Sequence, residues 1–137
     1  MKINVFAPVY LTKLWIKNKL LHDKTGHLLF ISSICTKKHF KGLSAYAMSK
    51  SAIESFSKTI SVEMSSRGIR SNLVLPGYME TSMTEGLTSE QLDKIKNRTP
   101  MKRLADIDEI CTLIEYLITY GTFINGAEIV IDGGYTL

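Results

Sequence analysis

Three short apolar runs, each ended by a turn or by glycine, are the most constraining feature of this 137-residue sequence. Runs of this length and composition are typical of β-strands that are buried on both faces of a sheet. Segments with apolar residues at helical spacing separate them, so the predicted order is helix, strand, helix, strand, helix, strand. This alternation predicts an α/β fold with a parallel sheet, whose three strands have the sequences HLLFISS, IRSNLVLPG and AEIVIDGG.

The first two predicted helices flank the first strand. Apolar residues at helical spacing predict an amphipathic helix from residue 4 to about residue 20, with Pro8 in its first turn. A longer helix is predicted from about Ala45 to Ser66. Ser44 is its predicted N-cap, and Gly68 is predicted to stop it.

The last third of the chain predicts two further helices. A polar stretch over residues 78–100 contains a short helix within 88–97, capped by Thr88 or Ser89. Asp106 is the predicted cap of the next helix. Its apolar side is predicted to consist of Ile107, Ile110, Cys111, Ile114, Leu117 and Ile118.

Polar and turn residues follow the first two predicted strands. Ser32 and Ser33 end the first strand, and the pair Pro76-Gly77 ends the second. Tyr46 and Lys50 open the helix between them, four positions apart. Because ligands of an open parallel sheet gather beyond the carboxyl ends of its strands, these residues are expected to share one edge.

A tyrosine, a lysine and a serine at one edge suit proton transfer to or from an alcohol. A phenol has an ordinary pKa near 10 and is a poor acid or base at pH 7. An ammonium one helical turn away favours the phenolate, and a nearby hydroxyl can hold a substrate oxygen in line. Taken singly, the same residues are also ordinary: two residues on one helix face and a serine in the turn after a strand.

Composition excludes several other classes of function. The net charge of +4 is mild, and the lysines are scattered without an aromatic RNA-binding motif, so no nucleic-acid partner is expected. Two cysteines and three histidines show no metal-ligand or redox spacing, so no metal site is expected. No apolar run reaches the length of a membrane span, and the start of the chain lacks a signal-peptide cleavage site. The protein is expected to be cytoplasmic.

Taken together, the motifs resemble the carboxyl-terminal half of a short-chain dehydrogenase/reductase. Ser33 lies 13 residues before Tyr46, and Lys50 lies four after it, as in the serine, tyrosine and lysine of that family. Asn4, at the head of the first helix, matches the asparagine that completes the family's catalytic set. The segments PGYMET, KRLADIDEI and IDGG also match family patterns, so the resemblance covers essentially all 137 residues. In kind, it is most similar to 3-oxoacyl-(acyl-carrier-protein) reductases.

The resemblance implies a role for each matching residue. Tyr46 is implied as the general acid/base, and Lys50 as the residue that lowers its pKa and binds the nicotinamide ribose. Ser33 is implied to orient the substrate oxygen, and Asn4 to hold a water in a proton relay. Thr81 is implied to bind the nicotinamide carboxamide, beside Pro76 and Gly77. The implied cofactor is NAD or NADP, and the implied substrate is a small alcohol or carbonyl compound.

The family's glycine-rich phosphate-binding turn has no match in this sequence, whose nine glycines include no G-x-G pair. We therefore expect a single domain over residues 1–137, forming the catalytic half of a Rossmann-like sheet without the family's amino-terminal strands. Weak or absent cofactor binding by the chain alone is expected. A homo-oligomer or a complementing amino-terminal half is the expected partner. The alternative function is a non-catalytic remnant that acts as an interaction module.

Overall fold

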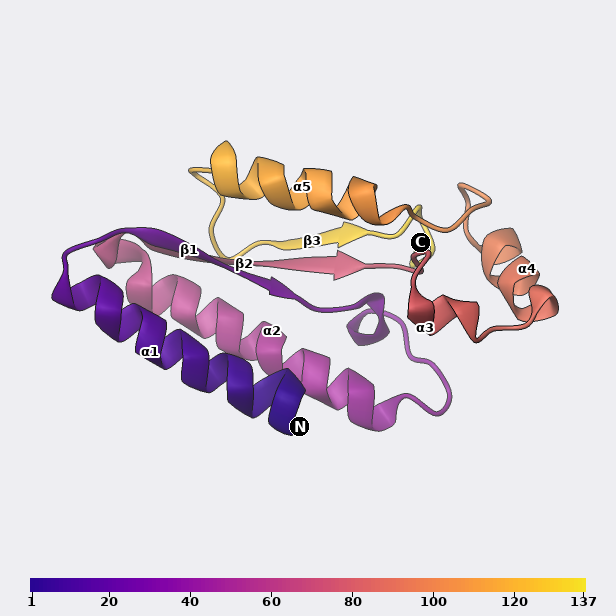
Figure 1. Ribbon diagram of the computed structural model, residues 1–137, viewed down its shortest axis with the longest axis horizontal. Helices are drawn as coiled ribbons and strands as arrows, with labels where there is room; N and C mark the ends of the chain where they lie inside the picture. The colour runs from indigo at the N-terminus through magenta and orange to yellow at the C-terminus, as the bar shows by residue number, and fades with distance from the viewer.

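A computed structural model describes residues 1–137, with the side chain of Met83 outside the description. Strands and helices alternate along the chain (Figure 1). The strands are β1 (Gly26–Ile31), β2 (Ile69–Pro76) and β3 (Glu128–Ile131). The α-helices are α1 (Ala7–Leu21), α2 (Ser44–Met64), α3 (Ser82–Glu85), α4 (Ser89–Arg98) and α5 (Ile107–Thr119). Short turns of other helix types are η1 (Lys2–Phe6), η2 (Ile34–Thr36) and η3 (Ser65–Arg67).

The three strands form one parallel sheet in the order β1-β2-β3, which confirms the predicted α/β arrangement. β2 is the middle strand, and its Leu73 pairs with Phe30 of β1 and Glu128 of β3. The side chains of Leu73, Val74 and Leu75 are 0% exposed. A strand segment that is covered on both faces is apolar on both, which explains the consecutive apolar residues Leu73, Val74 and Leu75 of β2.

Helices cover both faces of this sheet. α1 and α2 lie on one side and α5 lies on the other (Figure 1). Ile53 of α2 packs with Leu73 and Leu75, whereas Leu117 of α5 packs with Val74. Successive residues of a strand point to opposite faces, so these two clusters form separate apolar layers on either side of β2.

Several predicted helix ends are confirmed. The Asp106 Oδ1 atom accepts a hydrogen bond from the Asp108 amide at 3.1 Å at the start of α5. The Thr88 Oγ1 atom accepts one from the Gln91 amide at 3.3 Å at the start of α4. Gly68 has a φ of 68°, in the left-handed region that glycine adopts freely, and it ends the helical segment that follows α2.

The predicted N-cap of α2 is wrong. Leu43 occupies the cap position without a side-chain hydrogen bond, and Ser44 is the first helical residue. The first main-chain bond of the helix joins the Ala47 amide to the Leu43 carbonyl at 2.8 Å. A cap side chain reaches the free amides only from the non-helical residue before the helix, and Ser44 has already entered the helix.

α1 presents its apolar residues differently from the prediction. Thr12 is buried, and Val9 packs against the core beneath the helix. The helical spacing that predicted this helix includes Phe6, Tyr10 and Leu14, but these side chains are exposed, so α1 is apolar around much of its circumference. We define the α1 stripe as the exposed large apolar residues of η1 and α1, which are Ile3, Phe6, Tyr10, Leu11, Leu14, Leu20 and Leu21.

His27 of β1 is a polar group within the packed sheet. Its Nε2 atom lies 2.8 Å from the Nδ2 atom of Asn72, so the ring accepts a hydrogen bond from that amide. Burial, with a smaller effect from the charge of Arg70, lowers the pKa of His27 to about 4. The folded protein therefore holds this imidazole neutral across the physiological range.

We expect the free energy of unfolding to fall as the pH drops from about 6.5 towards 4. The folded pKa of His27 lies below its unfolded value, so its contribution is complete above pH 6.5 and is lost as the pH falls through about 4. After a discount for the partial exposure of the ring, the loss is on the order of 2 kcal/mol. Urea unfolding at pH 7 and pH 4 should show a smaller loss for His27→Asn than for the wild type. His39→Asn, at an exposed position, is the control, and an unchanged loss in His27→Asn would contradict the assignment.

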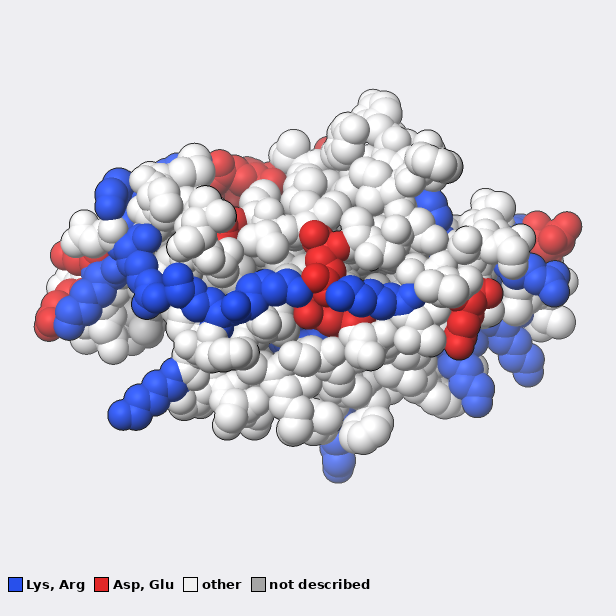
Figure 2. All heavy atoms as spheres, turned by 180° about the vertical axis from the view of Figure 1, so that it is seen from behind, with Lys and Arg blue, Asp and Glu red and all other residues white. Residues whose placement is uncertain are grey.

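Charges on the face opposite to the view of Figure 1 are mixed. Figure 2 shows acidic atoms between basic side chains across the middle of that face. The Nζ atoms of Lys37 and Lys58 lie 2.6 Å and 2.5 Å from the two carboxylate oxygens of Glu128. Cations that are paired in this way are less available to phosphate groups than free ones are.

The described residues contain neither a candidate membrane span nor a candidate metal site. None of their helices is long and apolar enough to cross a bilayer. No cluster of three or more histidine, cysteine, aspartate or glutamate side chains among them could hold a metal ion.

Candidate active site at the carboxyl edge of the sheet

A cavity of about 400 Å³ lies at the carboxyl edge of the sheet. Its walls come from the end of β1, from η2, from the start of α2 and from the segment between β2 and α3. Segments that are far apart in sequence meet at this edge because the strands are parallel and end together. Six of the seven predicted site residues line the cavity, namely Ser33, Tyr46, Lys50, Pro76, Gly77 and Thr81.

Tyr46 and Lys50 lie one turn apart near the start of α2 and face the same cavity. The Nζ atom of Lys50 lies 5.7 Å from the centre of the Tyr46 ring. It donates a hydrogen bond to the carbonyl oxygen of Ile31 at 2.9 Å. This bond anchors the lysine to the last residue of β1 and ties the start of α2 to the strand end.

The pKa of Tyr46 differs from the expectation. Burial raises the pKa of the phenol, a hydrogen bond with Ser33 opposes the rise, and Cys35 adds to it. Burial also lowers the pKa of the Lys50 ammonium. The net effect is therefore opposite to the expected lowering of the pKa of Tyr46 by Lys50. The physical reason is that the phenol loses water, while the ammonium lies over the ring and bonds to a backbone carbonyl.

Ser33 reaches the cavity from the turn that follows β1. Its backbone is extended, and its Oγ atom accepts a hydrogen bond from the Cys35 amide at 3.3 Å, which caps η2. The same hydroxyl interacts with the phenol of Tyr46 and lowers its pKa. The hydroxyl and the phenol are therefore directed to one region of the cavity.

Pro76, Gly77 and Thr81 form the opposite wall, where β2 ends and α3 begins. A Cβ atom on Gly77 would lie 2.7 Å from the Cβ atom of Asp132 and 2.8 Å from its Cα atom. Glycine is therefore required here for close packing of the ends of β2 and β3, whether or not a ligand binds. The amide of Thr81 donates to Thr84 Oγ1 at 2.9 Å, which fixes the start of α3.

Asn4 is the one predicted site residue outside the cavity lining. It lies in η1, and its Nδ2 atom donates a hydrogen bond to Ser49 Oγ at 3.2 Å. This contact ties η1 to α2 at the residue before Lys50. The implied role of Asn4 in a proton relay stays a prediction.

Other lining residues were not identified from the sequence, and most of them are apolar: Ile34, Cys35, Phe40, Leu43, Tyr78 and Met79. The rings of Phe40 and Tyr78 meet edge to face, with centroids 6.3 Å apart. Tyr78 directly follows the predicted strand end at Gly77, so its place in the cavity wall could have been predicted from the sequence. Phe40 lies in a loop without a motif, so its place in the wall depends on the tertiary fold.

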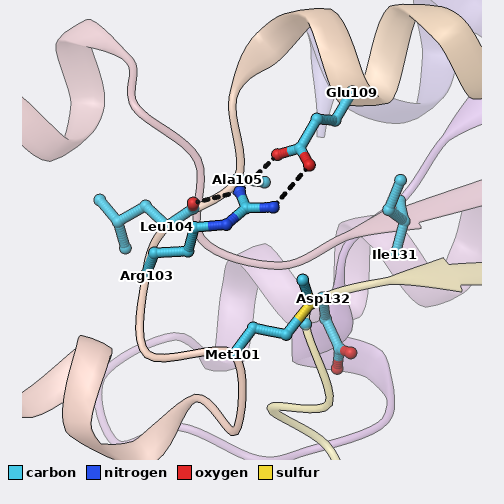
Figure 3. A pocket seen from close by; sticks show the side chains of 8 residues that line it. Met101, Arg103, Leu104, Ala105, Glu109, Ile131 and Asp132 are labelled. Atoms are coloured by element: carbon cyan, nitrogen blue, oxygen red, sulfur yellow. Dashed lines mark hydrogen bonds and ion pairs between the residues drawn. The ribbon is translucent and has the colours of Figure 1, made fainter.

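A second cavity, of about 70 Å³, lies beside the start of α5. Figure 3 shows the guanidinium group of Arg103 facing the carboxylate of Glu109, and the two hydrogen bonds measure 2.6 Å and 2.7 Å. The bond from Arg103 lowers the pKa of Glu109 to about 2. Asp132 in the same wall accepts hydrogen bonds from the amides of Gly134 and Thr136 at 2.8 Å and 2.9 Å. These groups satisfy one another, so packing explains this cavity better than a ligand does.

Comparison with known proteins gives matches over nearly the whole chain. The sequence model described as enoyl-(acyl carrier protein) reductase matches residues 1–136. The 3-oxoacyl-(acyl-carrier-protein) reductase of Buchnera aphidicola subsp. Baizongia pistaciae is 31% identical over 135 residues, which cover 98% of this chain and 55% of that protein. Carbonyl reductase family member 4 of Xenopus tropicalis is 31% identical over 137 residues, which cover 100% of this chain and 56% of that protein.

Solved structures share the fold. A 4-hydroxyisoleucine dehydrogenase complexed with NADH superposes with a TM-score of 0.94 at 29% identity, covering 98% of this chain and 56% of that one. A putative 2-deoxy-D-gluconate 3-dehydrogenase from Agrobacterium tumefaciens with bound NADP gives a TM-score of 0.95 at 25% identity, with the same coverage of 98% and 56%. The chain thus spans about half the length of the curated relatives it matches. Because a family model matches nearly all of its residues and its relatives share this fold, the chain belongs to the short-chain dehydrogenase/reductase family.

Proposed function

We propose that the chain forms the catalytic part of an NAD- or NADP-dependent oxidoreductase that interconverts an alcohol and a carbonyl compound. One observation carries the proposal: Ser33, Tyr46 and Lys50 line a single cavity at the carboxyl edge of the sheet. Membership of an oxidoreductase family supports the reaction class. The NADH and NADP that are bound in two solved relatives support the choice of cofactor.

The cavity suits the nicotinamide end of such a cofactor. Hydroxyl and ammonium groups of Thr81, Tyr46 and Lys50 border it together with the Pro76-Gly77 turn, and such groups bind amides and ribose hydroxyls. The sequence has no G-x-G turn to hold the phosphates, so we propose that a segment outside these 137 residues contributes that part of the site. A bound nicotinamide supplies or accepts the hydride.

In the direction of reduction, Tyr46 donates its phenolic proton to the carbonyl oxygen of the substrate. Burial favours the protonated phenol, which is the form that a proton donor needs at neutral pH. Ser33 holds the same oxygen through its hydroxyl, since that hydroxyl already interacts with the phenol. The ammonium of Lys50, 5.7 Å from the ring, stabilises the phenolate that remains after the proton has left.

An interaction module without catalysis is the second candidate, and two exposed surfaces favour it. The α1 stripe leaves seven large apolar side chains exposed, and we propose that a second copy of the chain packs against it. β1 lies at one end of the strand order, so its outer edge is available to a complementing strand. Assembly is compatible with either candidate, and turnover separates them.

A hybrid enzyme tests the proposed function. It joins this chain to the part of the Buchnera aphidicola 3-oxoacyl-(acyl-carrier-protein) reductase that lies outside the match. We expect the hybrid to oxidise NADH or NADPH with one or more ketones of a panel, followed by absorbance at 340 nm. The 137-residue chain alone should bind either cofactor too weakly for calorimetry to detect at micromolar concentration. A folded hybrid that binds NADH or NADPH but reduces no ketone and oxidises no alcohol would favour the interaction module.

A further inference from the structure

Glu54 is a buried carboxylate next to the proposed catalytic residues. It lies on α2 four residues after Lys50 and eight after Tyr46, so the three share one side of the helix. Only 7% of its surface is exposed. Burial of a carboxylate destabilises the folded state unless hydrogen-bond donors surround it. The contacts of Glu54 therefore indicate its role.

Two hydroxyl groups satisfy this carboxylate. Glu54 Oε1 accepts hydrogen bonds from Ser32 Oγ and from Thr36 Oγ1, both at 2.6 Å. The other carboxylate oxygen, Oε2, lies 3.6 Å from Lys37 Nζ. Short hydrogen bonds to an ionised acceptor are stronger than those between neutral groups. Glu54 therefore fixes the η2 turn against α2.

These contacts hold Ser33 from both sides. Ser32 precedes it and Thr36 follows three residues later, and both bond to the same carboxylate oxygen. Thr36 Oγ1 also lies 2.9 Å from the carbonyl oxygen of Ser33 itself. Building on the proposed function, we propose that Glu54 is a positioning residue, which holds the η2 turn so that Ser33 faces the cavity that it shares with Tyr46 of α2.

The pKa of Tyr46 reports the position of Ser33, and it can be measured without an assay of enzyme activity. Its hydroxyl lowers the pKa of Tyr46, whereas burial and Cys35 raise it, so loss of the Ser33 contact should raise that pKa further. Loss of a nearby negative charge has the opposite sign and lowers the pKa of a phenol. Glu54→Gln and Glu54→Met both remove the charge, but only glutamine keeps an acceptor oxygen for Ser32 and Thr36. This pair of variants therefore separates hydrogen-bonded positioning from an effect of charge.

The test uses the 137-residue chain with ¹³Cζ-labelled tyrosine, titrated by NMR. The resonance of Tyr46 is assigned by its loss in Tyr46→Phe, and exposed Tyr116 is the internal control. Glu54→Met should raise the pKa of Tyr46 relative to Glu54→Gln by the amount that Ser33→Ala raises it relative to the wild type. In a Ser33→Ala background, the Glu54 variants should give the same pKa. At pH 7, the Cζ chemical shift of Tyr46 should separate two groups. The wild type and Glu54→Gln keep the Ser33 contact, whereas Ser33→Ala and Glu54→Met lose it.

Equal pKa values for Tyr46 in Glu54→Met and Glu54→Gln would overturn the proposal, and so would a rise that persists in the Ser33→Ala background. If Glu54→Met does not fold, the Ser32→Ala/Thr36→Val double variant removes both donors and leaves the carboxylate in place. It should then raise the pKa of Tyr46 as Ser33→Ala does, and an unchanged pKa would count against Glu54 as a positioning residue. The readout needs neither cofactor nor substrate, so failure of the proposed function would leave this result interpretable.

Discussion

Tyr46→Phe in the hybrid enzyme is expected to lower kcat for carbonyl reduction by about 10²–10⁴-fold, the usual cost of losing a general acid. The substitution removes the proton that the substrate oxygen receives and keeps the aromatic ring. The ring remains beside Lys50, so the free energy of unfolding should change little. Steady-state kinetics with a ketone and NADH or NADPH measures the effect, and urea unfolding checks the fold.

Ser44→Ala is a matched control for this prediction. Ser44 is exposed, is the first residue of α2 and makes no capping hydrogen bond. Its loss should leave turnover close to the wild-type value, although it lies only two residues from Tyr46. Wild-type turnover in Tyr46→Phe, with the fold intact, would show that another group donates the proton.

The pH dependence of reduction should follow the direction of the pKa shift. The pKa of Tyr46 is raised by burial, so the protonated donor persists through neutral pH. The rate of reduction should therefore be flat there and fall only on the alkaline side, as the phenol ionises. Oxidation of the alcohol needs the phenolate, so its rate should increase with pH on the alkaline side, where the phenol ionises.

Tyr10→Lys together with Leu11→Lys is expected to weaken self-association of the chain by about 10²-fold or more. These side chains are 62% and 63% exposed within the α1 stripe. Burial of a large apolar side chain contributes roughly 1.5–3 kcal/mol, and each 1.4 kcal/mol is a factor of ten in Kd. Sedimentation velocity over a concentration series measures the association of the wild type and the double variant.

Phe123→Lys is the control for the α1 stripe. Phe123 is a fully exposed aromatic residue, but it lies in the segment between α5 and β3, outside the α1 stripe. Its substitution should leave self-association unchanged. A wild-type chain that sediments as a monomer at tens of micromolar would refute assembly through this stripe.

Much of the fold could be predicted from the sequence because the signals are local. The three consecutive apolar residues from Leu73 to Leu75 in β2 indicate burial on both faces, and the side chains of Asp106 and Thr88 bond to amides within one turn. The parallel arrangement follows from the alternation of helices and strands. Parallel strands end at a common edge, and this places Ser33 and the Pro76-Gly77 turn on one cavity with Tyr46.

The remaining features depend on contacts between segments that are distant in sequence. The pattern of α1 marked its apolar residues, but only packing decided that Val9 faces the core while Tyr10 and Leu11 face outwards. The net direction of the pKa shift of Tyr46 follows from burial, which its spacing to Lys50 does not report.

Glu54 illustrates the same division most directly. On the sequence it is one more charged residue of a long helix, 22 positions from Ser32 and 18 from Thr36. The fold brings both hydroxyls to 2.6 Å from its carboxylate oxygen. Ser32 and Glu54 are buried, and Thr36 is half-buried. Sequence patterns therefore determine which main elements form and where most of them end, because side-chain caps and apolar periodicity act over one or two turns. The tertiary structure decides which side chains lose water and which meet, because that depends on how whole elements pack.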